Sequence, residues 1–170
     1  MKKLLLPLLM VIPALLFSQS SFQKDLAGMI KANSDKVISL AEAIPAQDYG
    51  WRPADDIRSV NDVVLHITGA NYFFPTFAGV EIPAGIDPRN MNIVGKEASI
   101  EALKKSYDHM INSVMSIPED KLDNMVDVFG SQMTLRSVLL IAFGHCEEHM
   151  GQLIAYARSN NIAPPWSEGK

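Results

Sequence analysis

Two histidines near the end of the chain have the spacing of a metal-binding pair. His145 and His149 stand four residues apart in a segment with helical periodicity, so both side chains project from one helix face about a turn apart. Neutral imidazoles at this spacing can share one metal ion. The pair interrupts an apolar stripe formed by Leu135, Val138, Ala142, Leu153 and Tyr156. Because burying polar rings without partners is costly, the pattern predicts that the two imidazoles are paired or liganded.

A third histidine, His66, lies on the apolar side of an earlier helical segment, beside Val63, Ile67 and Ala70. If the two helices meet in the core, three neutral nitrogens come together. Three protein ligands and an open fourth position are typical of catalytic rather than structural zinc. The alternative is that each histidine is a hydrogen-bonded core or groove residue. His109 shares its helix face with polar residues, so we expect it to be exposed to solvent and not to bind metal.

Three further side chains lie near these histidines in the sequence. Glu148 is the candidate catalytic residue, because it could orient an imidazole or act as a base at the rim of the site. A solvated helix face also explains it. Asp62 could accept a hydrogen bond from His66, although its S-x-x-D spacing from Ser59 is typical of a helix-capping box. Cys146 lies about 100° from the ligand face, which favours a buried, inert thiol.

The segment from His145 to His149 also matches H-x-x-E-H, the motif of inverted zinc proteases. That class needs a distant acidic ligand downstream, and only Glu168 follows the final helix. The sequence contains no glycine-rich phosphate loop, Ser-His-Asp set or Cys-x-x-Cys pair. The sequence therefore argues against a protease, and the histidines are its strongest chemical signal.

Four segments with helical periodicity must position these residues, at about 22–44, 59–77, 97–117 and 135–159. Pro45 and Pro118 end the first and third. The pattern predicts an all-α protein, a four-helix bundle. The connection at 78–95 is unusually long, and we expect it to cross over an end of the bundle. Weak alternation from Val126 to Met133 predicts a small hairpin or an extended loop.

The first residues of the sequence predict an export signal. Lys2 and Lys3 precede an apolar run, Leu4 to Phe17, and then small polar residues. This is the pattern of a secretory signal peptide at 1–18, cut between about 18 and 21, whereas an uncleaved membrane anchor would need about 20 apolar residues. The prediction is a periplasmic or secreted protein with a domain at 21–165 and a tail at 166–170.

Charge and cysteine content exclude several classes. The net charge of the 170-residue chain is −4 at pH 7, and removing the two leader lysines makes it −6. No basic surface is expected for nucleic acid, nor a polybasic patch for stable membrane association. A single cysteine excludes an intramolecular disulfide.

The order of motifs resembles the DinB-like superfamily of DinB/YfiT-type proteins. The likeness runs through Trp51-Arg52-Pro53, the segment around His66, H-x-x-x-H-x-G-Q at 145–152, and Tyr156-Ala157-Arg158. The resemblance implies a four-helix bundle with a long crossover between the second and third helices. It also implies one divalent metal, with zinc expected first and nickel as the alternative, held by His66, His145 and His149. Gly151 is expected to permit close helix packing, and Gln152 to hydrogen-bond near the metal.

Characterised members of that family include thiol-dependent transferases and isomerases, and some are proposed to be metal-dependent hydrolases. An exported protein would not ordinarily meet a reduced thiol pool, which weakens the thiol-transferase reading. We expect an exported metal-dependent hydrolase or transferase acting on a small molecule. The alternatives are a non-enzymatic bundle that binds metal or a small ligand, and a bundle that has lost the site. A homodimer and a monomer are both compatible with the sequence.

Overall fold

The computed structural model describes residues 21–167, which form a bundle of four α-helices and one short β-hairpin. The helices are α1 (Ser21–Ala43), α2 (Val60–Phe73), α3 (Lys96–Ser116) and α4 (Leu135–Ser159). The hairpin joins β1 (Met125–Val128) to β2 (Ser131–Thr134). The predicted leader and its cleavage site lie outside the described residues. Within the described part, no helix is both long and apolar enough to span a membrane.

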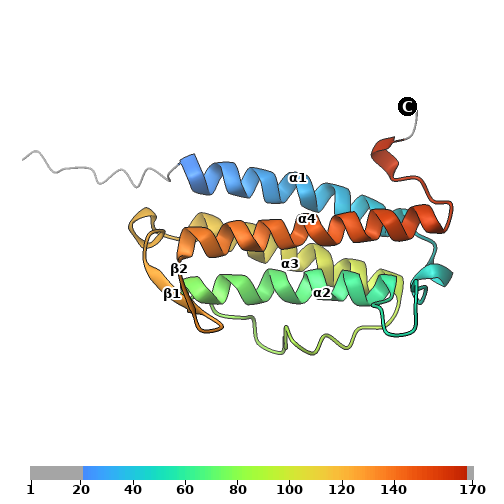
Figure 1. Ribbon diagram of the computed structural model, residues 1–170, viewed down its shortest axis with the longest axis horizontal. Coiled ribbons are helices and arrows are strands. Elements are labelled where there is room, and N and C mark those ends of the chain that lie inside the picture. The colour runs from blue at the N-terminus through green and yellow to red at the C-terminus, as the bar shows by residue number, and fades with distance from the viewer. Residues whose placement is uncertain (1–20, 168–170) are drawn as a thin grey trace, which may run out of the picture.

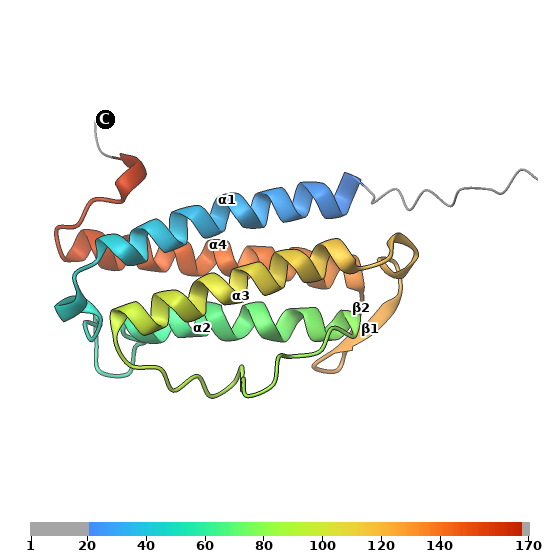
Figure 2. The same cartoon turned by 180° about the vertical axis from the view of Figure 1, so that it is seen from behind.

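Each helix packs against two neighbours. α3 and α4 both contact α1 and α2, so α1 and α2 occupy one diagonal of the bundle. α2 runs in the same direction as α3, and α1 in the same direction as α4 (Figures 1 and 2). Aliphatic side chains fill the interior; among the largest are Leu26, Ile30, Leu40, Ile67, Leu103, Leu139 and Leu153. Met29 lies at the edge of the apolar stripe of α1 and is 49% exposed.

The capping box at the start of α2 is formed as predicted. The backbone N–H of Asp62 donates to Ser59 Oγ at 3.2 Å, and that of Ser59 donates to Asp62 Oδ2 at 3.0 Å. At its other end α2 is shorter than predicted. Phe73 is its last residue, because Pro75 has no N–H to continue the helix, and a 3₁₀ turn follows at Phe74–Ala78.

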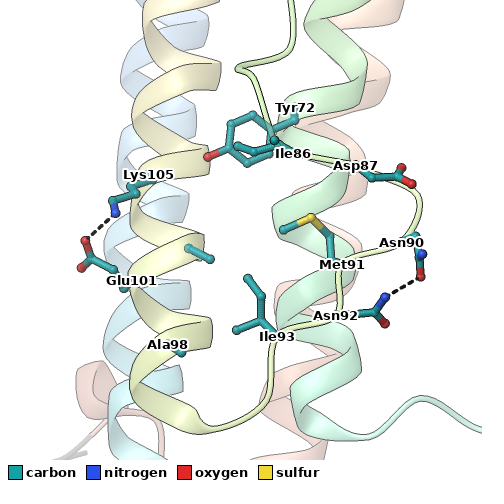
Figure 3. A pocket seen from close by; sticks show the side chains of 12 residues that line it. Tyr72, Ile86, Asp87, Asn90, Met91, Asn92, Ile93, Ala98, Glu101 and Lys105 are labelled. Atoms are coloured by element: carbon teal, nitrogen blue, oxygen red, sulfur yellow. Dashed lines mark hydrogen bonds and ion pairs between the residues drawn. The ribbon is translucent and has the colours of Figure 1, made fainter.

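The connection from 79 to 95 returns along the side of α2 (Figures 1 and 2). The expectation that it crosses an end of the bundle is therefore wrong, because the parallel α2 and α3 require the chain to travel the length of the bundle between them. Asn61 Nδ2 donates to the carbonyl of Ile93 at 3.0 Å, and Gly69 lies directly under the carbonyl of Pro88. The connection points Ile86, Met91 and Ile93 toward a cavity of about 500 Å³ beside Tyr72 and α3 (Figure 3).

The hairpin between α3 and α4 has an unusual turn. β1 and β2 pair antiparallel with Val128 opposite Ser131, which leaves Phe129 and Gly130 as a two-residue turn. Both have positive φ, +52° and +86°, as in type I′ turns, where Asn-Gly is preferred. Positive φ is unfavourable for a bulky side chain. Phe129 is nevertheless 80% exposed, so burial in the core does not offset its backbone strain.

Candidate metal centre

The structure brings the three predicted histidines together, one from α2 and two from α4. One ligand nitrogen from each lies within 4.8 Å of the others, and the Nε2 atoms of His66 and His145 are 3.0 Å apart. His149 is buried, whereas His66 and His145 are half-buried. His145 and His149 share one face of α4, and the antiparallel helix α2 packs against α4. The three histidine side chains therefore meet at one point, as the sequence predicted.

A chain of hydrogen bonds determines which nitrogen of His149 faces this point. The carbonyl of Arg58 can only accept, so the Tyr156 hydroxyl donates to it at 3.1 Å. Gln152 Nε2 then donates to the Tyr156 hydroxyl, at 2.8 Å. The remaining Gln152 oxygen accepts from His149 Nδ1–H, also at 2.8 Å. With its proton on Nδ1, His149 presents the Nε2 lone pair to the cluster, the usual way in which a neighbouring group prepares a metal ligand.

The Trp51-Arg52-Pro53 motif helps to hold these hydrogen-bonded groups in place, through Trp51. Trp51 is half-buried and packs its ring edge-on against Tyr156, with centroids 5.2 Å apart. Its carbonyl also accepts from Val60 N–H at 3.0 Å, which ties the loop to the start of α2. The loop before α2 thereby places both the Arg58 carbonyl and the Tyr156 ring.

The electrostatic environment keeps two of the rings neutral. Burial, reinforced by the positive charge of Arg58, lowers the pKa of His66 to about 4. Burial and then the neighbouring His149 lower the pKa of His145 to about 4, although Glu148 acts in the opposite direction. At neutral pH both imidazoles are therefore uncharged, the form that binds a metal.

The donor set fits a divalent metal. Nitrogen ligands of tetrahedral zinc lie 2.0–2.1 Å from the ion and hence roughly 3.3 Å from one another, which falls between the 3.0 Å of the His66–His145 pair and the 4.8 Å within which all three ligand atoms lie. His145 Nδ1 is buried without a hydrogen-bond partner in the described part of the chain. A shared cation would bind the other nitrogen, His145 Nε2, together with His66 Nε2, since these atoms already meet at 3.0 Å, and would offset part of the cost of burying the two rings.

The cluster opens onto a cavity of about 730 Å³ through His66 and His145. Its walls come from α2, the connection, the hairpin tip and α4, namely Arg58, Gly69, Ala70, Phe73, Phe74, Pro88, Arg89 and Phe129. The size suits a small organic molecule. A smaller cavity of about 220 Å³ shares Arg58, His66, Pro88 and Arg89 with it and also reaches Asp62.

The other candidates lie outside the cluster. Glu148 is exposed and does not line either cavity next to the histidines. Asp62 is held by the capping box and by an ion pair with Arg52 at 3.4 Å. Cys146 is buried, as predicted, and its thiol donates to Asn71 Oδ1 at 3.4 Å. Burial raises the pKa of this thiol to about 12, which makes it a poor nucleophile.

Two predictions about individual residues are wrong. His109 is half-buried against the Tyr72 ring, with Nε2 buried and unpartnered within the described residues. Its polar helix face is partly interior, because the Ser106 and Ser113 hydroxyls donate to carbonyls of their own helix and so need no water. Gly151 is exposed, and a Cβ added there would have nothing within 4 Å, so it permits no close packing. The glycine under close contact is Gly69.

Sequence reasoning missed several lining residues and one role. Arg58, Arg89 and Phe129 come from loops, where periodicity carries no information. Tyr156 was assigned to the core stripe without a role for its hydroxyl. Its spacing of two turns from His149, with Gln152 between them, is a signal from which the hydrogen-bonded chain could have been inferred.

Comparison with known proteins agrees with this architecture. The sequence model of the DinB superfamily matches residues 29–153. The uncharacterised protein YjoA of Bacillus subtilis (strain 168) is 29% identical over 123 residues, which span 70% of this chain and 78% of YjoA. The crystal structure of YjoA, a DinB-like protein, superposes with a TM-score of 0.67 at 23% identity, covering 82% of this chain and 93% of that one.

A second solved structure, a DinB-like protein from Bacillus cereus, has a TM-score of 0.73 at 13% identity and covers 84% of this chain and 95% of that one. At these identities the two structures establish the fold, and the sequence match over most of the described residues establishes the family. The chain belongs to the DinB superfamily.

Proposed function

We propose that the protein binds one divalent metal ion through His66, His145 and His149 and acts with it on a small molecule in the adjoining cavity. The observation that carries the proposal is the convergence of three imidazoles, one of them held by a hydrogen bond to Gln152, beside an open cavity. An ion held there supplies Lewis-acid polarisation of a substrate atom and a template for orienting it. Imidazole ligands suit zinc first and nickel as the alternative.

The residues of the chain itself do three things in this site. Gln152 and Tyr156 hold the Nε2 lone pair of His149 toward the cluster. Phe74 packs its ring against His145, with centroids 5.7 Å apart, and keeps water from that side. Arg58 adds positive charge beside His66. The cavity therefore favours a ligand with at least one negatively charged or strongly polar group.

Hydrolysis differs from group transfer in that the site must activate a water molecule. None of the described residues that line the larger cavity is an aspartate or a glutamate. Activation of water would therefore depend on the metal, which lowers the pKa of a bound water, and not on a carboxylate in this cavity, so the site fits hydrolysis and group transfer alike. The same observation favours the second candidate function, a non-enzymatic bundle that binds metal or a small ligand.

Metal analysis of the purified mature protein tests the proposal. After zinc loading and gel filtration we expect about one equivalent of zinc by elemental mass spectrometry. Replacing all three histidines by alanine should reduce it below a tenth of an equivalent. His109→Ala is the matched control, since that histidine lies against Tyr72 outside the cluster, and should retain the full amount. Less than a tenth of an equivalent in the wild-type protein would refute the proposal.

We infer from the leader pattern that the protein is exported and that residues 1–18 are removed. Expression of the full chain in a bacterial host tests this inference. The intact mass of the product from the periplasmic fraction should lack the first 18 to 20 residues. A product that keeps Phe17 and remains in the cytoplasm contradicts export.

A further inference from the structure

Two arginines line the cavity beside the histidines. Arg58 precedes α2, and Arg89 lies in the connection between α2 and α3; both line the larger and the smaller cavity. Within the described residues neither guanidinium takes part in an ion pair, whereas Arg52 nearby pairs with Asp62. Because Arg side chains are always charged, the mouth of the cavity carries two positive charges outside any ion pair of the described residues, and the one carboxylate that lines the smaller cavity, Asp62, is already paired with Arg52.

Aromatic rings lie next to these charges. The guanidinium carbon of Arg89 is 5.5 Å from the centroid of the Phe73 ring, which itself packs edge-on against Phe74. The Phe129 ring is nearly parallel to that of Phe73, with an interplanar angle of 16° and centroids 6.1 Å apart. The cavity thus combines a flat apolar wall with a cationic edge.

The backbone of Phe129 is an independent observation. Residues at positive φ in a two-residue hairpin turn are normally Asn or Gly, and Phe129 adopts φ +52° with its ring 80% exposed. Folding alone would favour another residue at this position. A strained residue at the edge of a cavity is a common sign of a functional constraint. Here the strained residue is an aromatic one that lines the mouth of the cavity.

We infer that this cavity binds a small aromatic oxyanion, with the ring against Phe73 and Phe129 and the acid group held by Arg58 and Arg89. The inference rests on the proposed function, because it names the class of ligand for the same cavity. A planar guanidinium matches carboxylate and phosphate oxygens alike, so the shared chemistry is an acid group on a flat apolar body.

Calorimetric titration of metal-free protein with 1-naphthylacetate, 1-naphthyl phosphate and the neutral 1-naphthylacetamide tests the inference. We expect at least one of the two acids to bind, and the amide to bind about tenfold more weakly or worse. The stronger of the two acids identifies the oxyanion as carboxylate or phosphate. Equal binding of acid and amide, or no binding of either acid at millimolar concentration, overturns the inference.

Arg58→Gln and Arg89→Gln should each weaken binding of the acid about tenfold. The matched control is Arg158→Gln, which removes an exposed charge from the end of α4, beside a different cavity, and should leave binding unchanged. An equal affinity for all three variants overturns the role of the arginines. Because the titration uses metal-free protein, loss of acid binding and loss of metal binding are separate results, and either proposal can fail alone.

Phe129→Asn distinguishes recognition from structure. Asn accepts positive φ more readily than Phe, so this variant should unfold at a higher temperature than the wild type while binding 1-naphthylacetate at least threefold more weakly. A residue that serves only the fold would not show opposite effects on stability and binding. Unchanged affinity in a variant that is more stable overturns the role assigned to the Phe129 ring.

Discussion

Gly69 gives the sharpest test of how the connection is held against α2. A Cβ at this position would lie 2.2 Å from the Pro88 carbonyl oxygen and 3.2 Å from its carbon. The nearest tolerable separation is about an ångström longer, so the connection must move away from α2 to admit a methyl group. Overpacking of this kind costs about 1–3 kcal/mol, whereas alanine gains about 0.5–1 kcal/mol over glycine inside a helix. We expect Gly69→Ala to lower the free energy of unfolding by about 1 kcal/mol, within a range of roughly 0 to 2.5 kcal/mol.

Gly151→Ala is the matched control. Gly151 also lies inside a helix, but nothing stands within 4 Å of its Cβ position. The same substitution there should raise the free energy of unfolding by about 0.5–1 kcal/mol. The two variants should therefore differ by about 1–3 kcal/mol, although each adds one methyl group to a helix.

Urea unfolding followed by circular dichroism measures both values, with an unchanged dependence on urea as the check that the two variants unfold alike. If Gly69→Ala is as stable as Gly151→Ala, the contact between α2 and Pro88 does not exist in solution. Pro88 and Arg89 would then not form the wall of the cavity beside α2.

Three further predictions concern the centre and its surroundings. Gln152→Ala should weaken zinc binding about 10- to 100-fold in competition with a chelator, because His149 loses the partner that fixes its tautomer; unchanged affinity would show that the bond does not orient the ring. Asp62→Asn should cost about 0.5–1 kcal/mol of unfolding free energy at pH 7 and less at pH 3. Burial raises the pKa of Asp62, but hydrogen bonds from Ser59 and the charges of Arg52 and Arg58 lower this pKa overall. The ionised carboxylate therefore stabilises the fold fully above the ordinary Asp pKa of about 3.9. This stabilisation is lost as the pH falls through the lowered pKa of the folded state. An equal cost at both pH values would contradict this. The Cys146 thiol, 2% exposed with its pKa raised to about 12 by burial, should react with a disulfide reagent only after unfolding, and rapid labelling of the native protein would disprove its burial.

Local chemistry made several features predictable from residues alone. The capping box needs only Ser59 and Asp62 at the right spacing, since both bonds are made within one turn. The pair on α4 needs only helical geometry, because residues four apart always share a face. His66 could be added because its neighbours in the sequence are apolar. The prediction of three converging histidines thus rested on two periodic segments and one assumption, that the segments meet.

Other features depended on contacts that no local pattern records. The path of the connection follows from α2 and α3 running in the same direction, which packing of the whole bundle decides. His109 was misjudged because serine hydroxyls that bond to their own helix can be buried without cost, so polar residues do not always mark a solvent face. Gly151 was assigned to close packing from its place beside the ligands, while the contact that requires a glycine lies at Gly69 on another helix.

The sequence by itself determined the helices, the capping box and the three histidines, since these depend on periodicities of a few residues and on the chemistry of imidazole. Only the tertiary structure decided what surrounds the histidines. Arg58, Arg89 and Phe129 reach the cavity from three loops far apart in the chain, and loop paths are set by long-range packing rather than by local preference. The possible metal ligands were therefore readable from spacing, whereas the groups that would select a ligand became visible only in the folded molecule.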